Sequence, residues 1–213
     1  MLFFENKRVL ILAPHTDDGE FGCGGSIAYM VDHGADVFYA AFSACKQSVL
    51  PQYPSDILVK EVKNATTVLG IKCNNLLLFD YEVRSFNYRR QEILDDILTL
   101  KRDVRPEIVI VPSQNDIHQD HYTISQEAVR AFKFSTILCY ELPWNTFNFQ
   151  TCCFIPLEEK YISMKIQALR KYESQAHRPY SNENFIRGLA LTRGVQCGEE
   201  MAEVFEVVRW IIR

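Results

Sequence analysis

Four short apolar runs recur through the first half of the chain, and they limit its possible folds more than any other feature. The runs are Arg8–Ala13, Val37–Phe42, Leu76–Phe79 and Glu107–Val111. Each is largely apolar without a regular polar alternation, which is typical of a strand that is buried on both faces. Parallel strands of this kind need crossover connections, which are right-handed in nearly all proteins. The pattern therefore predicts a mainly parallel sheet that is flanked by helices.

The stretches between these runs have the periodicity of helices. They cover Gly25–His33, Ser55–Leu69 and Tyr88–Arg102, and a further helical pattern runs from Tyr122 to Phe132. Gly34 and Gly70 follow two of them, at the position where a glycine commonly ends a helix. With 213 residues, of which 47% are apolar, the chain can form one full hydrophobic core. We therefore expect a single Rossmann-like α/β domain over residues 1–213.

The rhythm becomes less regular after about residue 135. A strand is expected at Ile137–Tyr140 and a helix at Leu157–Tyr172. A polar loop rich in Ser, Asn and Arg follows, and the chain closes with an apolar stretch at Val204–Ile212. We expect substrate specificity to be set in this half.

Composition and charge narrow the possible partners and the compartment. The net charge is -4, and no run of Lys or Arg could neutralise a row of phosphates, so nucleic acid is not expected as a partner. No apolar segment approaches the roughly 20 residues that span a bilayer, so we expect neither a signal peptide nor a membrane anchor. The seven cysteines are scattered and form no C-x-x-C pair, which fits a reducing cytoplasm.

Two polar clusters follow the first and the fourth apolar run. They are His15–Glu20 and Asn115–His121. Ligands of parallel sheets gather beyond the carboxyl ends of the strands, so both clusters should lie at one edge of the sheet.

The first cluster packs one imidazole and three carboxylates into six residues, which is costly unless a cation offsets the charge. His15 and Asp18 could both point at one metal ion, and Asp17 would remain free to take a proton from a metal-bound water. One alternative is a surface acidic turn in which Asp17 or Asp18 caps a helix that begins near Gly24. Another is a dinucleotide-binding turn, but Gly22–Ile27 lacks the third glycine of that motif.

The second cluster supplies two more imidazoles. His118 and His121 are three residues apart and share one face if the segment is helical. One could ligate the metal while the other serves the reaction, and Asp120 or Asp116 could orient the histidine that is not a ligand. Of the remaining histidines, His33 is expected at a helix C-terminus and His177 in a loop. Two histidines and a carboxylate also form the site of iron(II) oxygenases, which remains an alternative.

These motifs carry a family resemblance. His15-Thr16-Asp17-Asp18 with the following glycine turn, and Asp116-Ile117-His118-Gln119-Asp120-His121, resemble the two signatures of the LmbE/PIG-L family of zinc-dependent N-deacetylases. The similarity continues through Glu61, Leu69-Gly70, Pro106–Val109, Ser174-Gln175 and Ala202–Phe205. Two departures stand out: Thr16 replaces the proline of the family, and the Lys60-Glu61 pair stands where Arg-Glu is common. Because of Thr16, we expect a small loss of rigidity between His15 and Asp17, but not of activity.

The resemblance implies a role for each site residue. His15, Asp18 and His121 would be the metal ligands and Asp17 the general base, while His118 would stabilise the oxyanion or assist the leaving amine with support from Asp120. The metal would be zinc, although ferrous iron accepts the same ligands.

The resemblance also implies a substrate and a reaction. A metal-bound water would remove the acetyl group from an amino sugar or from its glycoside or nucleotide conjugate. Tyr140, Glu141, Trp144, Arg187 and Arg193 are available to line the sugar site. Related enzymes often form homo-oligomers. A metal- or sugar-binding module without turnover remains a non-catalytic alternative.

Overall fold

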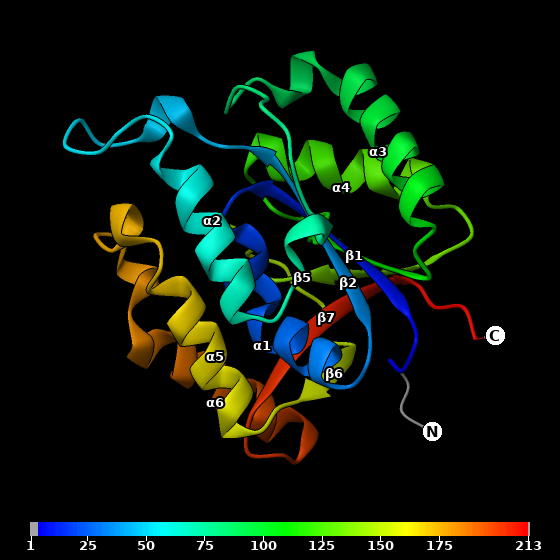
Figure 1. Ribbon diagram of the computed structural model, residues 1–213. Coiled ribbons are helices and arrows are strands. Elements are labelled where there is room, and N and C mark those ends of the chain that lie inside the picture. Colours follow the sequence, from blue (N-terminus) through cyan, green and yellow to red (C-terminus); the bar gives the residue numbers. More distant parts are fainter. Residues whose placement is uncertain (1–3, 213) are drawn as a thin grey trace.

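A seven-stranded sheet forms the centre of the computed structural model, which describes residues 4–212 (Figure 1). The strands are β1 (Arg8–His15), β2 (Asp36–Ser43), β3 (Leu76–Leu78), β4 (Ile108–Pro112), β5 (Thr136–Tyr140), β6 (Cys153–Pro156) and β7 (Ala202–Arg209). Their order across the sheet is β3-β2-β1-β4-β5-β7-β6. The first five strands are parallel, and β7 runs antiparallel to both β5 and β6. The expected α/β fold with a mainly parallel sheet is confirmed.

Helices cover both faces of this sheet. They are α1 (Asp18–Asp32), α2 (Ile57–Val68), α3 (Arg90–Val104), α4 (Gln119–Ala131), α5 (Glu159–Leu169) and α6 (Glu183–Cys197). In Figure 1, α3 and α4 lie over one face, whereas α1, α2 and α5 lie over the other. The side chains of β1 alternate between the two resulting cores, with Val9 and Ile11 in one and Leu10 and Leu12 in the other. This two-sided burial explains why the strand is continuously apolar.

Helix α1 differs from the expected helix at Gly25–His33. It begins at Asp18, and its backbone is non-helical at Cys23, with φ -150° and ψ 28°. The break frees backbone N–H groups in the second part of the helix, and the Glu203 carboxylate accepts from Gly25 at 3.1 Å and from Ser26 at 2.7 Å. The glycines of α1 also let neighbouring side chains approach closely, since a Cβ atom at Gly22 would lie 2.2 Å from the ring of Tyr140 on β5. Helix α1 begins three residues after the last residue of β1, so its first residues belong to the polar cluster His15–Glu20.

The second half also contains elements that the sequence pattern did not predict. Helix α6 occupies much of the expected polar loop. The sequence pattern did not reveal it, because only a narrow stripe of its residues is buried: Ile186, Ala190 and Gly194. Strand β6 is a four-residue strand at the end of the sheet, too short to give a recognisable pattern. The remaining expected helices and strands are present within a few residues of their expected ends.

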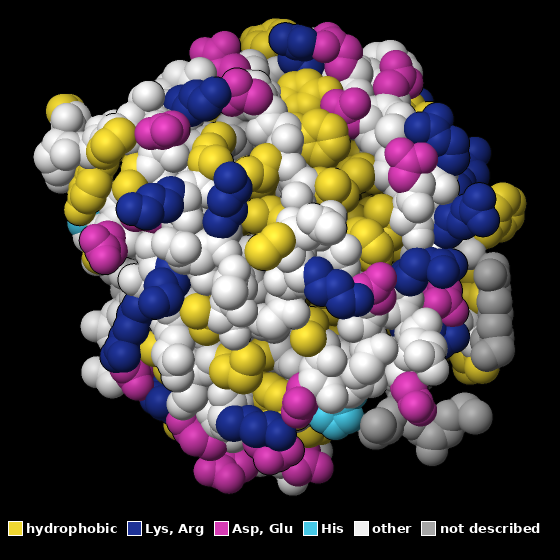
Figure 2. Space-filling model, in the orientation of Figure 1, with side chains coloured by type: hydrophobic (Ala, Val, Ile, Leu, Met, Phe, Trp, Pro, Cys, Tyr) yellow, Lys and Arg dark blue, Asp and Glu magenta, His cyan; other side chains and the backbone are white. Residues whose placement is uncertain are grey.

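The surface carries mixed charge. On the face seen in Figure 2, Lys and Arg side chains are interspersed with Asp and Glu, and apolar side chains lie among them. Among residues 4–212, every helix is too short or too polar to cross a bilayer.

Candidate active site

Adjacent parallel strands bring the two polar clusters together. β1 and β4 are neighbours, with Val9 opposite Ile108 and Ile11 opposite Ile110, so their carboxyl ends lie at the same edge of the sheet. His15 is the last residue of β1, and the loop after β4 leads to α4, on which His121 lies. The predicted meeting of the clusters is therefore observed.

Three donor atoms at this edge form a compact triangle. His15 Nδ1 lies 3.1 Å from Asp18 Oδ2 and 3.1 Å from His121 Nε2, and Asp18 Oδ2 lies 3.2 Å from His121 Nε2. The Asp18 carboxylate also accepts a hydrogen bond from the His15 backbone N–H at 2.8 Å, which fixes the turn between them. A triangle of this size leaves room for an ion about 2 Å from every corner, the usual bond length of zinc to N and O ligands.

A buried carboxylate orients each of these two imidazoles from behind. Asp120 Oδ2 lies 3.1 Å from His15 Nε2, and Asp116 Oδ2 lies 2.7 Å from His121 Nδ1. Carboxylates in this position fix the ring and the tautomer of a metal-binding histidine. Asp120 was expected to support His118; its carboxylate contacts His15 instead, and His118 accepts the Asp120 backbone N–H. The carboxylate points to His15 because Asp120 is the second residue of α4 and Arg84 N–H also binds it at 2.6 Å.

The charges of the cluster favour a cation at its centre. Burial opposes ionisation of Asp18, but His121 and His15 outweigh it and hold the pKa of Asp18 well below its usual range. Burial likewise opposes protonation of the imidazoles, yet Asp18 and the carboxylates behind them raise the pKa of His15 to about 9 and that of His121 to about 10. The protein therefore favours positive charge at this point, and a divalent ion could supply it. The donor set of two imidazoles and one carboxylate, all within reach of one point, fits a catalytic metal.

His118 lies beside the triangle and makes a different set of contacts. It is the N-cap of α4, and its Nδ1 accepts the backbone N–H of Asp120 at 3.2 Å. Burial and the two neighbouring imidazoles lower the pKa of His118 to about 4, so the ring is neutral and carries its proton on Nε2. The ring nitrogens of His15, His118 and His121 also lie within 4.8 Å of one another, which makes the three histidines a possible metal cluster. This grouping is wider than the triangle that contains Asp18.

Asp17 precedes the first turn of α1 without capping it. It occupies the N-cap position, but its side chain makes no capping hydrogen bond, which removes the alternative of a simple Asp17 cap. Burial raises the pKa of Asp17 to about 6, and the nearby Asp18 carboxylate adds to this rise. A carboxylate with a pKa near neutrality that lines an open cleft is suited to take up a proton.

Two tyrosines fix the backbone at Thr16, where the family resemblance leads one to expect proline. The Thr16 carbonyl accepts from Tyr39 Oη at 2.9 Å and from Tyr172 Oη at 2.7 Å. Both hydroxyls also contact the buried Glu20 carboxyl group. Burial raises the pKa of Glu20 to about 8. This network offers a source of rigidity between His15 and Asp17 other than a proline ring.

The cluster opens into a cleft of about 300 Å³. Its lining includes Asp17, Asp18 and the three histidines, together with Phe21 of α1 and side chains from other segments: Cys45, Arg84, Trp144, Asn145, Gln175, Arg178 and Tyr180. Trp144 and Tyr180 stack with ring centroids 3.9 Å apart and an interplanar angle of 7°. Phe21 meets both rings edge-on. An aromatic wall therefore bounds one side of the cleft.

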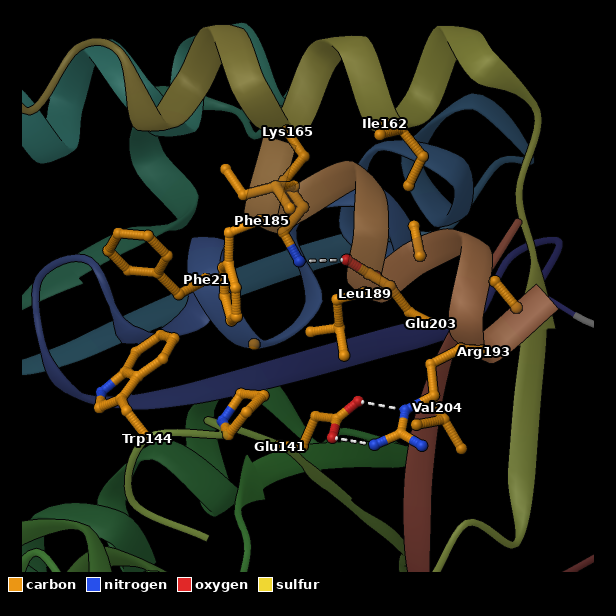
Figure 3. A pocket seen from close by; sticks show the side chains of 15 residues that line it. Phe21, Glu141, Trp144, Ile162, Lys165, Phe185, Leu189, Arg193, Glu203 and Val204 are labelled. Atoms are coloured by element: carbon orange, nitrogen blue, oxygen red, sulfur yellow. Dashed lines mark hydrogen bonds and ion pairs between the residues drawn. The ribbon is translucent and has the colours of Figure 1, made fainter. Parts of the chain in front are cut away.

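Of the five residues suggested for the sugar site, only Trp144 lines this cleft. Figure 3 shows a second pocket, which shares Phe21 and Trp144 with the cleft. Glu141 and Arg193 line the second pocket, where two hydrogen bonds join them at 2.8 and 2.6 Å. Tyr140 is fully buried, and Arg187 is engaged by Glu159 and Glu183 on the surface.

The remaining residues that the sequence singled out lie away from the reaction centre. His33 ends α1, with Nδ1 2.8 Å from the Tyr29 carbonyl oxygen, and His177 is exposed in a loop. Lys60 is exposed, whereas Glu61 is buried and accepts from Ser174 N–H and Oγ. Sequence reasoning missed Arg84 and Arg178, because isolated arginines in loops carry no local signal.

Comparisons with known proteins now identify the family. The model of the PIG-L family, described as GlcNAc-PI de-N-acetylase, matches residues 10–132, more than half of the chain. The chain belongs to this family. The match includes both polar clusters, so the motifs that carry the resemblance lie inside the matched segment. The family is one of deacetylases, and the possible metal cluster of three histidines fits a metal-dependent member.

Similarity to individual proteins extends beyond the segment that the family model matches. An uncharacterized deacetylase of Escherichia coli K12, YaiS, is 27% identical over 82% of this chain and 96% of its own length. The diacetylchitobiose deacetylase of Thermococcus kodakarensis is 26% identical over 94% of this chain and 83% of its own. The structure of N,N'-diacetylchitobiose deacetylase from Pyrococcus horikoshii, bound to its inhibitor MPG, has a TM-score of 0.81 at 22% identity. It covers 97% of this chain and 85% of that one, and it shows the same fold.

Proposed function

We propose that this protein is a zinc-dependent N-deacetylase that releases acetate from an amino sugar or from its glycoside or nucleotide conjugate. The observation that carries the proposal is the triangle of His15 Nδ1, Asp18 Oδ2 and His121 Nε2 beside a free carboxylate. Two observations support the acetamido sugar as substrate: the PIG-L family match and the similarity to a diacetylchitobiose deacetylase.

In this proposal His15, Asp18 and His121 hold the metal. Zinc at this position would lower the pKa of a water molecule and polarise the amide carbonyl. The carboxylates of Asp120 and Asp116 hold the two imidazoles in the required tautomer. Their role is positional, since each contacts a ligand and not the substrate.

Asp17 is the proposed proton acceptor. It lines the cleft next to Asp18, and its raised pKa lets it accept a proton from the attacking water near neutral pH. The same carboxyl group can then return this proton to the amine as the C–N bond breaks. Asp17 alone could therefore carry the proton from the attacking water to the leaving amine.

His118 is the proposed donor to the oxygen that becomes negative. Because its Nδ1 already accepts the Asp120 N–H, the ring presents Nε2–H to the cleft. A hydrogen bond that strengthens as negative charge develops lowers the barrier, and the loss of one such donor costs about 10²- to 10³-fold in rate.

A free-amine assay tests the proposal. The panel consists of N-acetylglucosamine, a simple N-acetylglucosaminide and a nucleotide-linked N-acetyl sugar. The protein is assayed as purified, after metal removal, and after refilling with zinc or ferrous iron, with Asp17→Asn in parallel. We expect amine release that is lost with the metal, restored by refilling, and reduced about 10²- to 10⁴-fold in the variant. Metal at full stoichiometry with no amine from any substrate would contradict the proposal and favour a binding module.

A further inference from the structure

The backbone between the proposed ligand His15 and the proposed base Asp17 is held by side chains from two distant parts of the chain. The carbonyl oxygen of Thr16 accepts from Tyr39 Oη of β2 at 2.9 Å and from Tyr172 Oη at 2.7 Å. Both tyrosines are buried. Two donors on one buried carbonyl fix the plane of the peptide that follows it. They therefore also fix the direction in which the Asp17 side chain leaves the backbone.

Glu20 joins the two tyrosine hydroxyl groups on their other side. Its Oε1 lies 2.8 Å from Tyr172 Oη, and its Oε2 contacts Tyr39 Oη. Tyr39 Oη also accepts from the N–H of Gly19 at 3.1 Å. The hydroxyl groups thus connect the Thr16 carbonyl with the first turn of α1, so that the backbone is held both before and after the proposed base.

The Thr16 side chain does not hold this turn by itself. Its hydroxyl group is buried and has no hydrogen-bond partner within residues 4–212. Its backbone N–H interacts with the thiol group of Cys45, which is a weak acceptor. Threonine does not lock φ as a proline ring does. The carbonyl oxygen is therefore the atom through which the protein holds Thr16.

Tyr172 also links this turn to the wall of the cleft. It follows α5 and directly precedes the segment 173–181, which contributes Gln175 and Tyr180 to the lining of the cleft. The segment is anchored at Ser174, whose N–H and hydroxyl group donate to the buried Glu61 carboxylate at 2.9 and 2.6 Å. A segment of the second half of the chain is thus connected to the backbone beside the proposed base.

We propose that Tyr39 and Tyr172 are positioning residues of the reaction, and that their hydroxyl groups give the turn at Thr16 the rigidity that a proline ring would otherwise provide. The inference rests on the deacetylase function proposed above, with Asp17 as the base. Neither tyrosine lines the cleft, so both act through the Thr16 carbonyl and not on the substrate.

Removal of single hydroxyl groups tests the inference. The variants are Tyr39→Phe and Tyr172→Phe, and the control is Tyr140→Phe, which removes a buried hydroxyl group that donates to the Leu12 carbonyl of β1 at 3.3 Å. On the zinc-loaded proteins, kcat should fall about 10- to 100-fold in the two network variants, because the base is misplaced. The zinc content and KM should stay at the wild-type values, and the control should keep its kcat. A wild-type kcat in both network variants would overturn the inference.

A proline at position 16 separates positioning from a general loss of stability. The structure can accept it, since His15 is extended, as residues before proline are, and the Thr16 hydroxyl group makes no hydrogen bond that would be lost. Thr16→Pro combined with Tyr172→Phe should restore kcat to within about threefold of wild type, because the ring fixes φ without the hydroxyl group. The free energy of unfolding, measured with urea, should stay at the lower value of Tyr172→Phe. A kcat that recovers only together with this free energy would assign the tyrosine to stability alone and overturn the inference.

Crystal structures of the zinc-loaded proteins test the same claim without turnover. The Asp17 carboxylate should occupy one position in wild type, move or take several positions in Tyr172→Phe, and return in the double variant. An unmoved Asp17 in Tyr172→Phe would overturn the inference even if amine release is observed. A displaced Asp17 in a protein that cleaves no substrate of the panel would support the positioning role, while the deacetylase function would fail.

Discussion

The two halves of the molecule contribute differently to the cleft. The first half, from β1 to α4, carries all the proposed ligands and proton-transfer groups, and these follow the ends of two neighbouring parallel strands. The second half, from β5 to β7, supplies Trp144, Arg178 and Tyr180 from loops. The proposed reaction chemistry thus lies where the regular topology fixes it, and most of the aromatic wall of the cleft lies in loops, which can vary.

The second half also supports the first. Glu203 of β7 holds the N–H groups of the second part of α1 and forms a buried ion pair with Lys165 of α5 at 2.6 Å (Figure 3). Tyr172 binds the carbonyl of Thr16. The two halves therefore differ in their proposed roles in chemistry and in substrate selection, whereas both contribute to stability. Four pairs of substitutions test this comparison.

The largest effect is expected at the proposed metal site. Asp18→Asn should lose the metal and reduce turnover to background, because it replaces the carboxylate at the corner of the triangle. His118→Gln should keep the metal and lower kcat by about 10²- to 10³-fold, since it removes a donor and not a ligand. Elemental analysis and initial rates measure both. Metal loss in His118→Gln with retention in Asp18→Asn would reverse the two roles.

Next in size is the support that the second half gives to α1. Glu203→Ala leaves the buried Lys165 unpaired and two backbone N–H groups unsatisfied, so the free energy of unfolding should fall by about 3–5 kcal/mol. Lys160→Gln, on the helix α5 that also carries Lys165, removes an exposed ion pair with Asp32 and should change the free energy of unfolding far less. Urea unfolding of both variants gives the comparison. Equal effects would show that the buried pair does not stabilise α1.

A smaller effect is expected behind His15. Asp120→Asn removes the carboxylate that orients this imidazole and should weaken metal affinity by about 10- to 100-fold. Asp96→Asn makes the same change outside the site, since it replaces a carboxylate of α3 that accepts from the Tyr81 hydroxyl, and it serves as the control. Competition with a chelator measures the affinity. An unchanged affinity in Asp120→Asn would mean that the His15 ring is held by other contacts.

The smallest effect should fall on the cleft wall. Trp144→Ala removes the ring that stacks on Tyr180, so KM should rise by about tenfold while kcat changes little. Phe147 is 79% exposed, does not line the cleft and offers a matched aromatic control, Phe147→Ala. A lower kcat with an unchanged KM would mean that Trp144 acts in the reaction itself, and it would contradict the proposed difference between the two halves.

More of the first half than of the second could be predicted from the sequence. Continuous apolar strands such as Arg8–Ala13 predict a parallel sheet because both faces are covered. Helix α6 was missed because its apolar residues are not confined to one face: Ile186 and Ala190 are buried, whereas Leu191 and Val195 are exposed. The direction of β7 was not predictable either, since its pairing with β5 depends on contacts between distant segments.

The same contrast holds within the site. The types and order of His15, Asp17, Asp18 and His121 are enough to indicate a metal site at the edge of the sheet. The pairing of Asp120 with His15 depends on how α4 begins, and the cleft position of Arg84 depends on a strained loop. Such features are set by tertiary contacts and leave no pattern in neighbouring residues.

A crystal structure of the zinc-loaded protein tests the central claim most directly. The account predicts one zinc ion bound to His15 Nδ1, Asp18 Oδ2 and His121 Nε2, at about 2.0–2.2 Å each, with His118 unligated and Asp17 facing the open coordination position. Zinc bound instead by the three histidines, with Asp18 outside its reach, would contradict the ligand set and the role of His118 together.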